Sequence, residues 1–214
     1  MDSFIVKLWL GILRLLRMLS PFDWLCLAVP KLSTSYGAVE VWVLAHLGLC
    51  IALLYGAQHL AFRVSEPWHL AICVYGGLRI LEIVVVNALV LLDIAAQGGN
   101  TQGVPPLRGY RRILLLAFHN YIEVILWFAV IFVCFPQHFN AAQCGANKSL
   151  CGVYFSLVTM ATVGYGDIYP SDDWGRALVG TQVAVAIFLT LVILARVVAY
   201  IPQPPSLDPD EQKR

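Results

Sequence analysis

The sequence has 214 residues, of which 59% are hydrophobic and only 13% are charged, and its mean hydropathy is +0.75. A single water-soluble core cannot bury that much apolar surface, so this composition excludes an ordinary soluble domain and makes lipid the main solvent. The formal net charge of +1 argues against nucleic acid as a partner, because phosphate binding needs a basic surplus gathered on one face.

The amino-terminal segment, residues 1–40, begins with an amphipathic pattern. Lys7 and Arg14 recur at helical spacing on one face, and the opposite face is apolar. We therefore expect a cytoplasmic helix that lies in the membrane interface. A second interpretation is a partly inserted leader to the first span, although Lys7, Arg14 and Arg17 interrupt the apolar run that a signal peptide needs.

Four later segments are long and apolar enough to cross a bilayer, which takes about 20 helical residues. They are residues 41–62, 69–96, 113–135 and 174–201. The first two, within residues 41–96, are expected to form peripheral helices, and a cytoplasmic linker, residues 97–112, follows them.

The stretch between the third and fourth spans, residues 136–173, is interrupted too often by Gly, Asn, Asp and Pro to cross the membrane. After the fourth span, residues 202–214 are Pro-rich and charged, which predicts a disordered cytoplasmic tail and no regulatory domain.

Lys and Arg are distributed unevenly between the segments that flank these spans. With the amino terminus inside, most basic residues fall in inner segments, and only Arg63, Lys148 and Arg176 fall in outer ones. This positive-inside pattern predicts that both ends lie in the cytoplasm and residues 136–173 outside. We expect the membrane to be the plasma membrane.

Cys144 and Cys151 bracket a polar stretch of this outer loop. Two cysteines in an oxidising compartment can pair, but their spacing alone does not decide whether they do. Asn147-Lys148-Ser149 between them spells a glycosylation acceptor, and its use depends on the host.

The same loop contains Thr162-Val163-Gly164-Tyr165-Gly166. Gly164 and Gly166 can adopt backbone angles closed to other residues, which lets successive carbonyls turn toward one axis and replace the water of a dehydrated cation. Val163 and Tyr165 would then pack outward, and the Thr162 hydroxyl would add a further oxygen.

The string from Tyr154 to Pro170, followed by Trp174-Gly175-Arg176, resembles the tetrameric potassium channel family of the P-loop cation channel superfamily. The resemblance covers roughly residues 113–199. It implies an all-α membrane protein with four transmembrane helices per subunit and a re-entrant pore helix and selectivity-filter loop between the third and fourth. It also implies that residues 113–201 are the pore domain and that a homotetramer surrounds a central pore, which conducts K⁺ ions passively and catalyses no reaction.

The resemblance also implies roles for individual residues. The pore helix would run from Cys151 to Ala161, and the inner helix would carry Gln182 close to it, bonding neighbouring helices. Ala186 stands where many members have a hinge glycine, so a sharp bend there is not expected. The filter would be Thr162, Val163, Gly164, Tyr165 and Gly166, its support and outer mouth Tyr154, Phe155, Thr159, Asp167 and Tyr169, and its cavity lining Ile187, Thr190 and Leu194.

Some of these roles are more specific. Tyr154 and Phe155 would belong to an aromatic collar around Tyr165, and Tyr154 would hydrogen-bond Asp167. Tyr169 would ring the mouth and admit external quaternary ammonium blockers through cation–π contact. External barium block is the other expectation. Asp172 and Asp173 would either concentrate cations or cap the last helix.

Polar residues inside the spans have two interpretations. The second span offers only Arg79, so the usual arginine repeat of a voltage sensor is absent from it. Arg79 and Glu82, with Asn87, His119 and Glu123, would form either a gating or proton-sensing network or the contacts that join the peripheral helices to the pore.

Three function classes fit the sequence. Potassium conduction is the leading one. A non-conducting or regulatory subunit of a hetero-oligomeric channel and an ion transporter built on related loops are the alternatives, and the chain has one such loop where transporters carry four. His46, His59 and His69 show no metal-ligand spacing with the cysteines, so no metal centre is expected.

Overall fold

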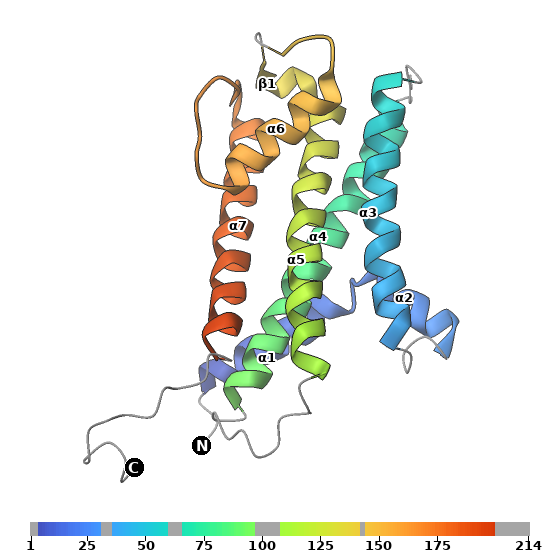
Figure 1. The fold of residues 1–214 in the computed structure, drawn as a ribbon, viewed down its shortest axis with the longest axis vertical. Coiled ribbons are helices and arrows are strands. Elements are labelled where there is room, and N and C mark those ends of the chain that lie inside the picture. The colour runs from blue at the N-terminus through green and yellow to red at the C-terminus, as the bar shows by residue number, and fades with distance from the viewer. Residues whose placement is uncertain (1–3, 31–35, 60–65, 97–107, 142–143, 200–214) are drawn as a thin grey trace, which may run out of the picture.

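The computed structural model describes residues 4–30, 36–59, 66–96, 108–141 and 144–199. Four long helices run side by side along the longest axis, and two short helices lie near one end of them (Figure 1). The elements in chain order are α1 (Phe4–Arg17), α2 (Pro21–Ala28), α3 (Tyr36–His59), α4 (Glu66–Ala96), α5 (Arg108–Cys134), a 3₁₀ turn (Pro136–His138), β1 (Phe139–Asn140), α6 (Lys148–Met160), β2 (Tyr169–Pro170) and α7 (Asp173–Ala199).

The four predicted spans are present, and their helices begin somewhat earlier than predicted. Helices α3, α4, α5 and α7 are long and apolar enough to cross a membrane, which makes this a multi-pass membrane protein. Because α5 starts at Arg108, the last residues of the predicted linker, 97–112, are helical; residues 97–107 and the predicted tail, 202–214, lie outside the described residues.

The amphipathic amino terminus is helical over Phe4–Arg17, as predicted, and packs against α4. The second short helix, α2, was not predicted. Ser20 caps it by accepting a hydrogen bond from the Asp23 amide at 3.2 Å, and Pro21 occupies its first turn. Ser-Pro at a helix start is a recognisable signal, so the sequence did contain the information for α2.

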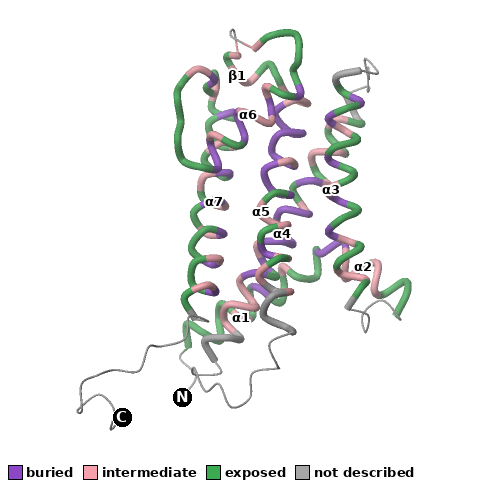
Figure 2. Tube along the Cα trace, viewed as in Figure 1, coloured by how far each residue is buried: buried purple, intermediate pink, exposed green. Residues whose placement is uncertain are grey.

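Helix α5 lies at the centre of the fold and contacts α3, α4, α6 and α7. Its middle is almost continuously buried, with Val124 and Ala129 fully buried and Trp127 and Phe128 nearly so (Figure 2). By contrast, α3 and α7 each keep one long face exposed, which lipid or other protein must cover.

Helix α6 has only 13 residues, about 20 Å of helix, and is too short to cross a bilayer. It starts three residues earlier than the predicted Cys151, because the Asn147 side chain caps it by accepting a hydrogen bond from the Leu150 amide at 2.9 Å. The chain after α6 runs as an extended ribbon back along α7, on the opposite side of the molecule from α3 (Figure 1). It then pairs with β1, Asn140 facing Tyr169.

Candidate functional site

Along the segment 162–166, residues with positive φ alternate with residues outside the left-handed region. Thr162, Gly164 and Gly166 have φ angles of 56°, 57° and 77°, while Val163 and Tyr165 lie outside the left-handed region. Positive φ was expected at the two glycines. It was not expected at Thr162, because a β-branched residue rarely has positive φ. Alternation of this kind turns successive peptide planes toward the same side, whereas a regular strand points them alternately to opposite sides.

The segment is also open on its outer surface. Every residue from Ala161 to Gly166 is exposed, in the loop that follows α6 in Figure 2. Val163 and Tyr165, both apolar and large, are 52% and 71% exposed. Within the described part of the chain nothing covers them. Large exposed apolar groups beside a strained backbone mark a surface completed by another molecule.

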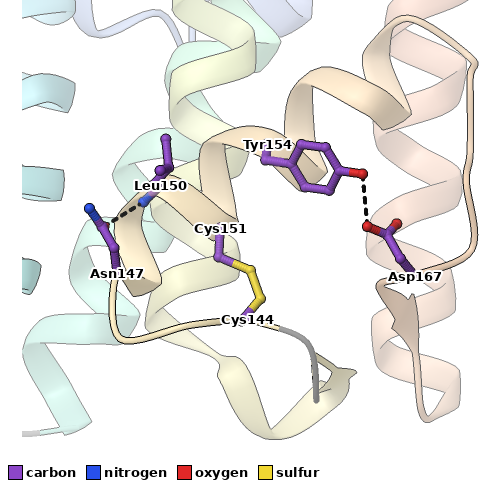
Figure 3. Close-up of a disulfide and its surroundings, with 6 residues drawn as sticks. All are labelled: Cys144, Asn147, Leu150, Cys151, Tyr154 and Asp167. Atoms are coloured by element: carbon purple, nitrogen blue, oxygen red, sulfur yellow. Dashed lines mark hydrogen bonds between the residues drawn. A yellow bond between two sulfur atoms is a disulfide. The ribbon is translucent and has the colours of Figure 1, made fainter.

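Both ends of this segment are anchored to α6. At its start, the Thr162 and Val163 amides donate to the carbonyls of Thr159 and Val158, each at 3.0 Å. At its far end, the Tyr154 hydroxyl donates to the Asp167 carboxylate at 2.7 Å, the hydrogen bond that the sequence predicted (Figure 3). This bond raises the pKa of Tyr154 above its ordinary value.

Helix α6 is in turn fixed between α5 and α7 by buried polar contacts. The Ser156 hydroxyl donates to the Ile125 carbonyl of α5 at 2.7 Å, and the Gln182 amide of α7 donates to both the carbonyl and the hydroxyl of Ser156 at 2.9 Å. Ser156 and Gln182 are fully buried. The interhelical role predicted for Gln182 is therefore confirmed, whereas the role of Ser156 went unpredicted.

The two other residues predicted to support the segment make different contacts. Phe155 packs its ring on Phe132 and Phe139, with centroids 4.8 and 5.7 Å away. Among the described residues, no ring contact joins Phe155 to Tyr165. Thr159 is buried at the end of α6, and its carbonyl accepts from the Thr162 amide.

The turn that follows the segment is held by side chains on both strands. Asn140 donates its side-chain amide to the Tyr169 hydroxyl at 2.7 Å, and Tyr169 is 48% exposed. Asp172 accepts from the Gly175 amide at 2.8 Å and also bonds the His138 ring, so it caps α7 as one of the two interpretations proposed. The Gly175 amide, and then His138, lowers the pKa of Asp172.

Along α7, the side chains predicted to line a cavity share one exposed face. Ile187 and Leu194 are 50% and 55% exposed, and Thr190 is also exposed. Helix α7 continues without a break through Ala186, which is buried. The helix is therefore unbroken at the position where a hinge glycine was not expected.

Among the polar residues predicted to form a network inside the spans, Arg79, Glu82 and Glu123 form one buried cluster, whereas Asn87 and His119 each bond a carbonyl of their own helix, those of Ile83 and Leu115. Arg79 of α4 bonds Glu82 at 2.6 Å and Glu123 of α5 at 2.7 and 2.9 Å, and all three side chains are at most 4% exposed. Glu82 also accepts from the Ser20 hydroxyl and the Phe22 amide of the amino-terminal segment. These groups face other helices, as residues at membrane depth should.

Cys144 and Cys151 form a disulfide, the pairing that the sequence left undecided (Figure 3). It ties the loop before α6 to the first turn of that helix. Within the described ranges, no group of three or more His, Cys, Asp or Glu side chains is arranged to hold a metal ion.

Residues 121–203 match the profile of a family described as "Ion channel". "Two-pore potassium channel 4" of Arabidopsis thaliana is 30% identical over 89 residues, which cover 42% of this chain and 31% of the relative. "Potassium voltage-gated channel subfamily A member 10" of Mus musculus is 36% identical over 87 residues, which cover 39% of this chain and 16% of the relative. The chain thus spans less than a third of the length of these relatives, and no solved structure matches it.

Proposed function

We propose that this chain is one subunit of a potassium-selective channel. The premise is that residues 121–203 belong to the potassium channel family. The observation that carries the proposal is the backbone of residues 162–166, in which three left-handed residues alternate with two others. Such a backbone presents a row of carbonyl oxygens on one side, and rows of this kind replace the hydration shell of K⁺ in a filter.

One chain supplies only one such row, so a ring of oxygens requires four copies around a common axis. The exposed side chains fit this assembly. Val163 and Tyr165 would be covered by a neighbouring copy, and the α7 face with Ile187, Thr190 and Leu194 would line the water-filled cavity below the filter. The assembly is a homotetramer in which K⁺ is the transported ion.

The proposed orientation puts the amino and carboxyl ends in the cytoplasm. The α6 end of the bundle then faces the outside of a plasma membrane. The distribution of Lys and Arg supports that orientation. The disulfide between Cys144 and Cys151 also supports it, because disulfides persist on the oxidising side of a membrane.

The test is reconstitution of the purified protein into a planar bilayer with unequal K⁺ and Na⁺. The reversal potential should approach the K⁺ equilibrium potential. Gly164→Ala should abolish selective current, because φ at this residue is +57°, which strains any residue with a side chain. The effect would not be steric, since nothing lies within 4 Å of the added methyl group. Gly48→Ala in α3, where the space is equally open and the φ is helical, is the matched control and should conduct normally.

Unselective current from the parent protein, or unchanged selectivity in Gly164→Ala, would contradict the proposal. If only mixtures with another pore subunit conduct, the chain is instead the regulatory subunit considered as the alternative.

A further inference from the structure

A cavity of about 920 Å³ opens between α3, α4 and α5, in the half of the bundle nearest α6. Its lining residues lie within residues 52–57 of α3, residues 69–72 of α4, the end of α5 from Val130, and the chain that follows α5 up to Gln137. The cavity exists because α3 and α4 each pack on α5 but scarcely touch one another here. Its size is within the range of about 300–1,000 Å³ that small-molecule sites have.

Most of this cavity lies at the depth of the candidate spans Gly37–Ala57, Trp68–Leu92 and Leu114–Cys134. Its inner walls are apolar and include Leu53 and Val130. Water gains too few hydrogen bonds in such a space to fill it stably. A hydrocarbon chain, by contrast, recovers the dispersion contacts that an empty cavity would lose.

The rim next to α6 is polar and carries a cation on a backbone turn that is restrained on both sides. Lys148 lines the rim with Gln137 and His69, is exposed, and pairs with no carboxylate among the described side chains. The residues before and after Lys148 are each restrained by a hydrogen bond. Asn147 caps α6, and the Ser149 hydroxyl donates to the Leu54 carbonyl of α3 at 2.7 Å.

The Cys144–Cys151 disulfide further restrains this turn (Figure 3). An apolar cavity at membrane depth that ends at a cation on a restrained turn matches the two parts of an anionic lipid. We propose that one acyl chain of an anionic phospholipid fills the space between α3 and α4, with its phosphate on the Lys148 ammonium group.

The proposal is tested by bound lipid, so its outcome does not depend on whether the protein conducts. The protein is reconstituted in equal amounts of phosphatidylcholine and phosphatidylglycerol, extracted gently, and its retained lipids are counted by native mass spectrometry. The parent protein should retain phosphatidylglycerol preferentially. Lys148→Gln should lower that preference about fivefold, the usual effect of one basic residue near a membrane surface, and Lys148→Glu should lower it further.

A second pair of variants tests the acyl-chain part of the site. Ala57→Trp and Leu70→Trp each add bulk to one wall of the cavity, from α3 and α4. Both should lose the retained lipid while the oligomer stays intact. The controls are Leu44→Trp, at a residue of α3 that is 56% exposed and does not line the cavity, and Lys7→Gln on α1. Both should retain lipid like the parent.

Equal retention of the two lipids by the parent protein and by Lys148→Gln would mean unselective boundary lipid and would overturn the proposal. Absence of retained lipid, with dissociation of the oligomer in both tryptophan variants, would mean that a neighbouring copy fills the cavity, which also overturns it.

Discussion

The Tyr154 hydroxyl and the Asp167 carboxylate, 2.7 Å apart, join the middle of α6 to the far end of the segment that would form the filter. Because the start of the segment is bonded to the last turn of α6, the same helix fixes both of its ends. The left-handed residues between them are thereby held in a conformation that an unrestrained chain would populate poorly.

Removing that bond should loosen the filter without unfolding the protein. Tyr154→Phe keeps the ring and deletes only the hydroxyl, so we expect assembled channels with shorter openings in single-channel recordings. Asp167→Asn should act in the same direction. The double variant should be no worse than the more affected single variant, because both changes break one interaction; additive effects would show that the two residues act separately.

The buried Ser156 should matter for stability. Ser156→Ala removes the donor to the Ile125 carbonyl and one acceptor for Gln182, which leaves buried polar atoms without partners. We expect a loss of about 1–3 kcal/mol in the free energy of unfolding. Thermal unfolding in detergent measures it, with Ser171→Ala as control because Ser171 is exposed and its hydroxyl makes only a 3.5 Å contact. Equal stability of the two variants would contradict this role.

Arg79 should be among the most sensitive positions in the protein. Arg79→Met leaves Glu82 and Glu123 buried without their cation, which is expected to cost about 3–5 kcal/mol and to lower the yield of the folded oligomer. Arg17→Met removes a pair whose arginine is 55% exposed and should cost less than about 1 kcal/mol. Yield and unfolding temperature compare the two.

The same variant separates the two interpretations of the buried cluster. If the surviving Arg79→Met channels keep the pH and voltage response of the parent, the cluster serves to join helices. An altered response at normal yield would instead indicate gating.

The spans could be predicted from the sequence because their signal is local: each is an unbroken apolar run of sufficient length. The Tyr154–Asp167 bond was also predictable, but only through the family resemblance. Contacts such as Ser20 with Glu82 and Ser149 with Leu54 were not, since they join residues 62 and 95 positions apart and depend on how whole helices dock. The contacts of Phe155 were not predictable for the same reason, because its ring packs on Phe132 and Phe139, which lie far from it in the sequence.

Asp172 should make the turn before α7 sensitive to acid. Hydrogen bonds from the Gly175 amide and His138 lower its pKa below the ordinary 3.8, so they stabilise the fold when the carboxylate is charged. That stabilisation is complete above about pH 4 to 5 and is lost as the pH falls through the lowered pKa. Asp172→Asn should therefore unfold at a lower temperature than the parent at pH 6, and the difference should shrink below pH 3.8. A difference that stays constant down to pH 2.5 would contradict this, and Asp173→Asn, whose carboxylate side chain is 98% exposed, is the control.

Tyr169 should determine block by external tetraethylammonium if four copies surround one pore. Tyr169 is 48% exposed and its hydroxyl accepts a hydrogen bond from Asn140, so four rings would present their faces in a fixed orientation at the mouth. A quaternary ammonium ion over such rings gains about 0.5–2 kcal/mol by cation–π attraction, so Tyr169→Val should weaken block roughly tenfold. Asn140→Ala keeps the ring but frees its hydroxyl, and should weaken block less. Dose–response curves in bilayers measure all three proteins, and a parent channel that is insensitive to the blocker, together with an unchanged Tyr169→Val response, would remove Tyr169 from the mouth.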